Sequence, residues 1–405
     1  MMEKGISLIG LVVLMGIAWL FSNNKKQIDL RVVLGGLGLQ FVLAIIILKT
    51  DMGRGFFTMA NDGISAVISL SDAGAEFVFG KQFTEHFFAF KVLPTIIFVS
   101  SLSYVMFYLG VLQKIVEALA WVMKKIMNIS GAEALVTAAN VFVGQTEAPL
   151  LVKPYIKTMT KSEITTMMVG GMATVAGGVL AAYVGFGISA GHLLAASIMS
   201  APASIVIAKL MVPEMETSPT MGTVKLNVVS DEVNIFEAAC KGATEGLKLS
   251  LNVGAMLIAF IGLVAFANLI LQQLGGWIGF QTTLEEIVGY IFRPLAFIIG
   301  VPWSESAIVG QFLGTKIIVN EFLAYFQLAE YLKPESAIKL SERSIIISTY
   351  ALCGFGNFTS IAIQIGGIGA LSPERRQDFA LFGFRAMIGG TLAAMMTACI
   401  AGVLI

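Results

Sequence analysis

The sequence has little charge. Asp, Glu, Lys and Arg make up 13% of its 405 residues, whereas about 25% is usual in a soluble protein. Hydrophobic residues make up 57%, and the mean hydropathy is +0.85. This composition excludes an ordinary soluble domain and predicts an integral membrane protein with room for roughly eight to ten spans. The formal net charge is zero and there is no long basic run, so no nucleic-acid polymer is expected as a partner.

Cysteine and histidine are also scarce. The three cysteines, Cys240, Cys353 and Cys399, have no CxxC spacing, which argues against a disulfide framework or a cysteine metal site. The two histidines, His86 and His192, lie near the ends of apolar segments, where a surface or interfacial position is expected. No histidine falls within a predicted span and no HExxH motif is present, which argues against an enzyme.

Long uncharged runs predict eight membrane spans. They lie near residues 5–22, 32–49, 92–112, 164–187, 193–212, 249–271, 344–370 and 386–405. The first run is expected to remain as a span, because it lacks the basic start and the cleavage site of a signal peptide. Four segments between the spans are expected to stay outside the bilayer core or along its surface. They are a mixed acidic segment at 51–88, an amphipathic helix at 113–128, a hydrophilic loop at 213–231 and an interfacial helix at 232–246.

The distribution of basic residues predicts the orientation. Lysines and arginines cluster between spans one and two, on both sides of segment 133–160, at the end of span five and between the last two spans. Such residues collect on the cytoplasmic side of a membrane protein. All of these clusters fall on that side if both termini face outward, although Lys333, Lys339 and Arg343 then fall outside. The sequence therefore predicts a multi-pass protein with both termini outside.

Segments 133–160 and 303–332 are predicted to be re-entrant hairpins. The orientation above holds only if each enters and leaves the membrane on the same side, and about 28 residues are enough for two half-helices but not for two crossings. Polar side chains lie near the middle of each, in Gln145-Thr146-Glu147 and in Asn320-Glu321. Ionisable groups at membrane depth are costly and usually functional. We therefore expect a substrate or ion site at the two tips.

The two hairpins stand at equivalent places in an expected inverted repeat. Each precedes a span interrupted by glycines, around residues 170–178 in the first unit and 354–357 in the second, and a further span follows. One hairpin opens to the cytoplasm and the other outward, which is the plan of many secondary transporters. A channel is the alternative with paired hairpins, but two buried carboxylates with amide and hydroxyl neighbours favour alternating access.

Three motifs carry a resemblance to a known family. They are GQTEAPL at 144–150, G-x-K-x-x-x-N-E-F-x-A-Y at 314–325 and CGFGNFTS at 353–360. In these motifs and over essentially its whole length, the chain resembles the concentrative nucleoside transporters, in their bacterial eight-span, sodium-coupled form. The resemblance implies an all-α polytopic membrane protein with about eight transmembrane helices, two re-entrant helical hairpins and interfacial helices in an inverted repeat.

The resemblance also implies a domain organisation, an assembly and a location. Residues 1–112 are expected to be mainly scaffold, with an interfacial segment near 51–88, and residues 113–213 to form the first transport-domain repeat. Residues 214–272 would hold a loop, an interfacial helix and a scaffold span, and residues 273–405 the second transport-domain repeat. The family forms homotrimers in the lipid bilayer, here the bacterial cytoplasmic membrane. Its transport domain moves like an elevator while sodium drives uptake of a nucleoside such as uridine.

Site residues follow from the same resemblance. The residues facing or packing on the nucleobase would be Gln145, Thr146, Glu147 and Val179. The residues on the ribose side would be Glu321, Asn357 and Ser360, with Phe355 packing on the substrate. The sodium site would use Asn140, the carbonyl of Val143, Thr174 and Val175. The chemistry agrees, because carboxylate and amide groups pair well with vicinal hydroxyls and a hard cation prefers oxygen ligands.

Several alternatives stay open at this point. Gln145 and Thr146 could pack helices together, and Glu147 and Glu321 could bond to backbone at the hairpin tips. Thr174 could bond back to its own helix. Lys316 is expected to pair with a nearby carboxylate and to order the second hairpin. Coupling to protons through a buried glutamate is the alternative to sodium, and purine against pyrimidine preference is not determined.

Overall fold

The computed structural model describes residues 2–221, 232–278 and 282–405, and in these ranges the chain is built from helices and the turns that join them. Seven helices in the described residues are long and apolar enough to cross a membrane. In five of these candidate spans the membrane-crossing part is one continuous α-helix: α1 (Met2–Leu20), α2 (Leu30–Lys49), α10 (Ala190–Met211), α11 (Ile235–Ile278) and α17 (Arg376–Leu404). The other two contain α4 (Leu93–Tyr108) and the pair α8 (Lys161–Ala173) and α9 (Gly177–Gly185). The expected all-α polytopic class is confirmed.

The predicted span at 344–370 is a broken helix, like the one at 164–187. It consists of α15 (Glu342–Leu352) and α16 (Phe358–Leu371). The chain leaves the helical path at Gly354, whose φ of +103° favours a residue without a side chain. Helix α16 then starts from Asn357, whose side chain accepts a hydrogen bond from the Ser360 amide. The sequence CGFGNF therefore ends one helix and begins another inside the protein.

The helices divide into a buried inner group and an outer group. The most apolar windows of α8–α9, α10 and α17 are 83%, 89% and 83% buried, whereas those of α1, α2 and α11 are 28%, 33% and 6% buried. A helix with an exposed apolar surface needs an apolar solvent or a partner. The outer group therefore presents the surface expected to face lipid, and the inner group contains the first broken helix, α8–α9.

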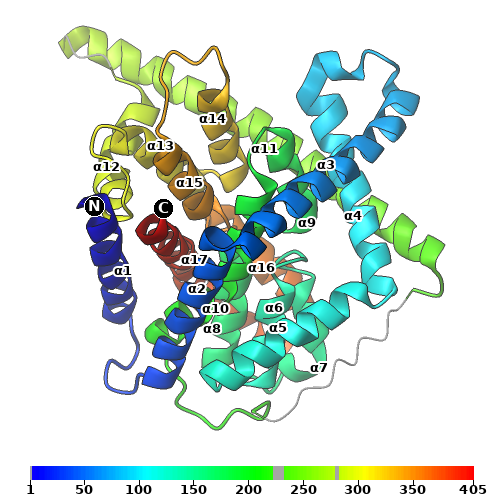
Figure 1. Cartoon of the computed structure of the whole chain (residues 1–405), viewed down its shortest axis with the longest axis vertical. Coiled ribbons are helices and arrows are strands. Elements are labelled where there is room, and N and C mark those ends of the chain that lie inside the picture. The colour runs from blue at the N-terminus through cyan, green and yellow to red at the C-terminus, as the bar shows by residue number, and fades with distance from the viewer. Residues whose placement is uncertain (1, 222–231, 279–281) are drawn as a thin grey trace.

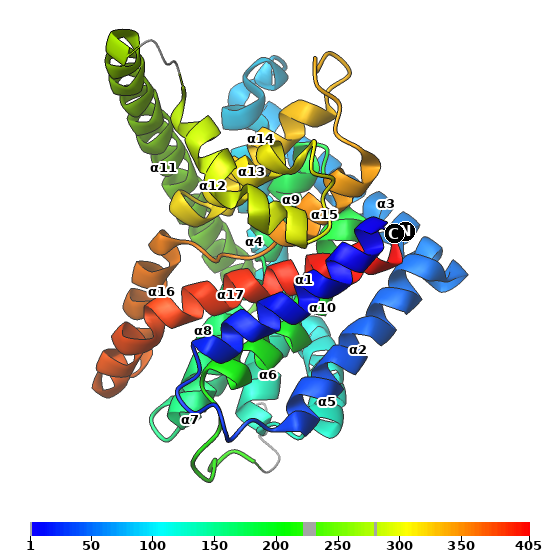
Figure 2. The same ribbon diagram turned by 90° about the vertical axis from the view of Figure 1, so that its left-hand side faces the viewer.

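Both predicted hairpins are present, and they lie toward opposite ends of the molecule (Figures 1 and 2). The first consists of α6 (Gly131–Ala139), an irregular loop, the short η3 (Ala148–Val152) and α7 (Lys153–Ile156). The second consists of α13 (Ser306–Ile318) and α14 (Glu321–Leu332). The N- and C-terminal ends lie near each other in both views, and Lys4 Nζ donates to the Leu404 carbonyl at 3.4 Å.

Three connecting segments extend or correct the sequence prediction. The predicted amphipathic helix is α5 (Val111–Met127), which buries one apolar face. The mixed segment at 51–88 begins with one 29-residue helix, α3 (Asp51–Phe79). The separate interfacial helix predicted at 232–246 is wrong, because residues 235–246 and the following span form the single 44-residue helix α11.

Two glycines lie where α11 packs against α4. A Cβ at Gly242 would lie 2.7 Å from Ser101 Cα, and one at Gly246 would lie 2.7 Å from Ile97 Cα. These two glycines, four residues apart, let the backbone of α11 pack closely on α4, as small residues do in membrane helix pairs. They serve helix contact and do not end the helix.

A helix before the second hairpin was not predicted. Helix α12 (Leu284–Ile298) begins at a capping box, in which the Thr283 hydroxyl and the Glu286 carboxylate bond to each other's backbone amides. It precedes the second hairpin as α5 precedes the first. The observed order in both halves is therefore an amphipathic helix, a hairpin, a broken helix and a long helix.

Candidate functional site

The two helix breaks touch each other. Gly354 lies against the end of α8, and a Cβ there would be 2.6 Å from the backbone carbon of Ala173. The tip of the first hairpin joins the same place, because the Gly177 amide at the start of α9 donates to the Phe142 carbonyl at 3.3 Å. Broken helices expose backbone groups that can bind ions and polar ligands. The geometry therefore brings the first hairpin and both breaks together.

An amide cluster connects the first hairpin to both broken helices. Gln145 Nε2 donates to Ser360 Oγ at 3.2 Å, and Gln145 Oε1 accepts from Gln364 Nε2 at 3.1 Å. The same Gln364 nitrogen donates to the Met168 carbonyl at 3.0 Å. Gln145, Ser360 and Gln364 are all buried. Two residues predicted for different parts of the substrate, Gln145 and Ser360, are thus in direct contact.

The carboxylate of Glu321 lies at the first turn of α14 and is buried. Its Oε2 accepts from Asn357 Nδ2 at 2.8 Å and its Oε1 accepts from the Tyr183 hydroxyl at 3.3 Å. The positive end of a helix favours an anion at this position. The expected grouping of Glu321, Asn357 and Ser360 is present, because the Asn357 side chain also accepts from the Ser360 amide at 2.8 Å. Among the residues that the structure describes, Glu321 thus bonds to one phenol and one side-chain amide.

The other predicted substrate residues lie in the same elements. Thr146 and Glu147 follow Gln145 in the hairpin loop and are half-buried. The carboxylate of Glu147 folds back over Gly144 and occupies the space that a Cβ at that position would need. Val179 is buried in the first turn of α9, and Phe355 is half-buried in the break between α15 and α16.

The residues predicted for sodium lie between the first hairpin and the α8–α9 break. Asn140 is 1% exposed, and neither its Oδ1 nor its Nδ2 has a hydrogen-bond partner in the part of the chain that the structure describes. Thr174 and Val175 form the break, and Val143 lies in the irregular part of the hairpin. An unpaired buried amide is costly. Its oxygen and the loop carbonyls are donors of the type that a hard cation prefers, so these residues fit sodium.

Thr174 also makes the bond that the alternative interpretation expected. Its hydroxyl donates to the Gly170 carbonyl of its own helix at 3.0 Å, which leaves oxygen lone pairs able to accept or to bind a cation. A further unpaired oxygen, Thr137 Oγ1, lies close by. A Cβ added to Gly170 would be 3.4 Å from both Thr137 Oγ1 and Asn140 Nδ2. Thr137 is thus a candidate cation ligand that the motif comparison missed.

The structure changes the role expected for Lys316. The lysine is fully buried, and its Nζ donates to the carbonyls of Ala351 and Cys353 at 2.9 and 3.0 Å. These carbonyls belong to the last turn of α15 and the residue that follows it, where a helix leaves acceptors unpaired. Lys316 therefore closes the end of the broken helix with its ammonium group, and the expected pairing with a carboxylate is wrong.

Besides Thr137, two functional candidates were missed from the sequence, Gln364 and Tyr183. Gln364 is the one polar side chain of α16 after Ser360, and Tyr183 lies in the short apolar helix α9. A lone amide in an apolar run could have indicated Gln364 from the sequence.

The structure also places His192, which was expected at a surface or interface. Its side chain is half-buried, with Nδ1 3.5 Å from the Tyr350 hydroxyl.

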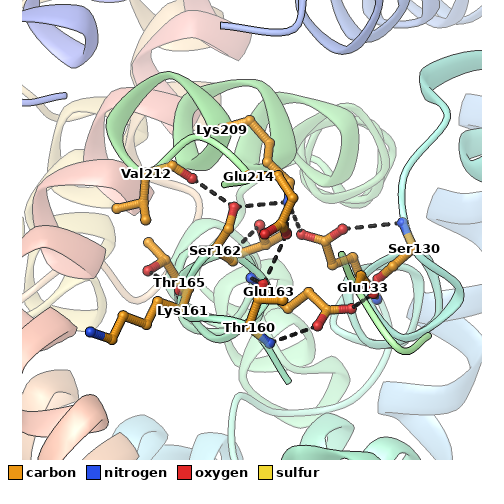
Figure 3. Close-up of polar contacts among 12 residues, drawn as sticks. Ser130, Glu133, Thr160, Lys161, Ser162, Glu163, Thr165, Lys209, Val212 and Glu214 are labelled. Carbon is orange, nitrogen blue, oxygen red and sulfur yellow. Dashed lines mark hydrogen bonds and ion pairs between the residues drawn. The ribbon is translucent and has the colours of Figure 1, made fainter. Parts of the chain in front are cut away.

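A buried polar network holds the base of the first hairpin (Figure 3). Capping boxes start α6 and α8, with Ser130 paired to Glu133 and Thr160 paired to Glu163. Lys209 of α10 forms an ion pair with Glu133, Nζ to Oε1 2.5 Å, and donates to Ser162 Oγ at 2.9 Å. Lys209 thereby connects α10 to the start of α6 in the first hairpin and to the start of α8 in the first broken helix.

Comparisons with known proteins cover most of the chain. Family models described as "Na+ dependent nucleoside transporter C-terminus", "Na+ dependent nucleoside transporter N-terminus" and "Nucleoside recognition" match residues 192–402, 9–82 and 89–190. An uncharacterized transporter of Haemophilus influenzae is 48% identical over 98% of this chain and 97% of its own length. Solute carrier family 28 member 3 of Rattus norvegicus is 43% identical over 99% of this chain, which spans 59% of the rat protein.

Solved structures agree with the sequence matches. CNTnw in an inward-facing substrate-bound state is 42% identical, with a TM-score of 0.94 over 99% of this chain and 97% of that protein. These relatives bear the names of transporters, in agreement with the expected class and not with an enzyme. The chain belongs to the Na+-dependent nucleoside transporter family.

Proposed function

We propose that this protein is a symporter that takes up uridine-like nucleosides together with sodium. The observation that carries the proposal is a pair of buried hydrogen bonds near the point where both helix breaks meet. Gln145 bonds to Ser360, and Asn357 bonds to Glu321. A nucleoside has a flat base with polar edges and a ribose with vicinal hydroxyls. These two pairs of residues supply matching donors and acceptors within one buried region.

On the ribose side, Glu321 accepts hydrogen bonds from the sugar hydroxyls. Its carboxylate is already oriented by Asn357 and Tyr183, and hydrogen bonds to an ionised acceptor are the stronger class. Asn357 and Ser360 complete the set, and Phe355 packs on the substrate. A site built to bond hydroxyls rejects analogues that lack them, because its own buried groups are left unpaired.

On the base side, Gln145, Thr146 and Glu147 face the nucleobase edge, with Val179 packing beside it. The sodium ion is held by Asn140, the Val143 carbonyl, Thr174 and Val175. The unpaired Asn140 amide supports this assignment. The cation supplies a positive charge next to the first hairpin, and the chain supplies the oxygen ligands.

For movement and assembly we infer an elevator. The scaffold comprises residues 1–112 and 214–272, the transport domain comprises residues 113–213 and 273–405, and the protein works as a homotrimer. The location is the bacterial cytoplasmic membrane with both termini outside. The buried inner helices and the exposed apolar outer helices support this division.

Proton coupling is the second candidate, because Glu147 and Glu321 are carboxylates at membrane depth. The experiment that separates the two is uptake of radiolabelled uridine into proteoliposomes. An inward sodium gradient is expected to drive uptake, and choline with an imposed proton gradient is not. Uptake driven by protons alone would assign coupling to a carboxylate, and uptake under neither gradient would contradict the nucleoside substrate.

A further inference from the structure

Within the proposed function, we infer that Gln364 is a positioning residue that sets which end of the Gln145 amide faces the nucleobase. Gln364 sits in α16, is completely buried, and is outside the three motifs that carry the family resemblance. It joins α16 to the first hairpin and to α8 through one nitrogen. The inference rests on Gln145 facing the base, and it adds a reason for preferring one base edge over another.

The starting point is the Met168 carbonyl, which can only accept a hydrogen bond. Gln364 therefore turns its Nε2 toward Met168, 3.0 Å away, because the opposite orientation would place two acceptor oxygens together. Amide orientations are assigned from their hydrogen-bond partners, and a backbone carbonyl is a partner with a fixed role. The orientation of Gln364 is thus set by the main chain of α8.

The orientation of Gln145 follows from that of Gln364. The second hydrogen of Gln364 Nε2 points to Gln145, so the Gln145 atom 3.1 Å away must be the acceptor Oε1. Gln145 Nε2 is then left to face Ser360 Oγ at 3.2 Å. The Ser360 hydroxyl can either donate or accept, so it does not impose an orientation of its own. The Met168 carbonyl thus orients the Gln364 amide, which in turn orients the Gln145 amide. We call this sequence of oriented groups the order of dipoles.

Gly171 of α8 provides the space in which the two amides meet. A Cβ at this position would lie 2.9 Å from Gln145 Cβ and 2.9 Å from Gln364 Nε2. Both amides are packed against the backbone of α8, and neither is exposed by more than 7%. Rotation of one amide without the other would break at least one of the three bonds, and buried polar groups that lose partners are costly.

The consequence is a fixed donor at the substrate. Gln145 Nε2 has two hydrogens and Ser360 takes one, so the other is available to the ligand. A base edge that offers a carbonyl is favoured there over an edge that offers an amine. Uridine has a carbonyl at C4 where cytidine has an amine, so the order of dipoles favours uridine.

The test is the variant Gln364→Glu. In its neutral form the new side chain donates its O–H to Met168 and accepts from Gln145, and in its ionised form it can only accept. In both forms Gln145 turns its Nε2 toward residue 364 and its Oε1 toward Ser360 and the substrate. We expect the ratio of half-saturating concentrations, cytidine to uridine, to fall roughly tenfold, since one matched hydrogen bond becomes a pair of opposed acceptors.

The matched control is Gln40→Glu. Gln40 is equally buried, lies in α2 and donates to its own helix, and like Gln364 it has a side-chain Oε1 with no hydrogen-bond partner among the described residues. It reproduces the cost of placing a carboxyl group inside the protein, and the cytidine-to-uridine ratio should stay unchanged. A second variant, Gln364→Leu, removes the orienting bond altogether. It should weaken uptake of uridine more than that of cytidine and move the ratio toward one.

Uptake of both nucleosides is measured in proteoliposomes for the wild-type protein and the three variants. An unchanged ratio in both Gln364 variants would overturn the inference, as would an equal shift in Gln40→Glu. If Gln364→Glu does not fold, Gln364→Leu alone decides by the same ratio. Failure of the wild-type protein to transport either nucleoside would contradict the proposed function itself, which is a separate result.

Discussion

Replacing Glu321 by Gln tests the ribose side of the proposed site. The carboxylate accepts from Asn357 at 2.8 Å and from Tyr183 at 3.3 Å, and a glutamine can keep one of these bonds through its oxygen. The fold should therefore survive. What is lost is the charge of the acceptor that receives the sugar hydroxyls.

The size of the loss follows from hydrogen bonds to charged groups, which contribute about 1.5–3 kcal/mol each. Because 1.4 kcal/mol corresponds to a factor of ten, losing one such bond raises the half-saturating uridine concentration by roughly 10- to 150-fold. If two sugar hydroxyls bond to this carboxylate in the wild-type protein, losing both bonds would bring uptake close to zero at ordinary substrate concentrations. The assay is sodium-driven uridine uptake into proteoliposomes, with size-exclusion chromatography as the check on folding.

Glu330→Gln is the matched control. Glu330 lies on the same helix, α14, but is exposed and paired with Lys333, Nζ to Oε1 2.6 Å. An exposed ion pair contributes little, so uptake should be nearly unchanged. If folded Glu321→Gln protein transports uridine with wild-type half-saturation, the ribose assignment is refuted.

Three further predictions concern the cation site and the supports of the two hairpins. Asn140→Ala should raise the sodium concentration for half-maximal uptake more than it changes the preference between nucleosides, and the reverse pattern would remove Asn140 from the cation site. Lys209→Ala should lower the free energy of unfolding by about 3–5 kcal/mol, because the buried Glu133 loses its partner, and Lys209→Met combined with Glu133→Gln should recover part of it in a detergent melting assay. Lys316→Met should lower the melting temperature through the unpaired carbonyls at the end of α15, and an unchanged melting temperature would contradict the proposed capping role.

The parts of the structure that the sequence predicted well are those determined locally. Uncharged runs indicate buried or lipid-facing helices, and the polar tips of the hairpins are visible because they interrupt such runs. The helix break at Gly354 could be predicted because CGFGNF combines a residue suited to positive φ with an N-cap at Asn357. These features depend on residues only a few positions apart.

The parts that could not be predicted depend on contacts between distant residues. The sequence alone does not show whether Gly242 and Gly246 end a helix or let it pack closely against α4. Only the position of α4 answers this. Lys316 was expected to find a carboxylate, but the acceptors it reaches are main-chain oxygens, which have no signature in a sequence. Gln364 has a role only because Met168 lies beside it.

The contact between Gly354 and Ala173 has a mechanical consequence. The α8–α9 break and the α15–α16 break are in direct contact, since no space remains between Gly354 and the end of α8. One residue beyond Ala173 is Thr174, proposed for the ion, and three beyond Gly354 is Asn357, proposed for the sugar. If the backbone moves at one break, the backbone at the other break must move with it, because the two are in direct contact. The proposed coupling of ion and solute therefore needs no long-range relay through the protein, and by thermodynamic linkage it acts equally in both directions.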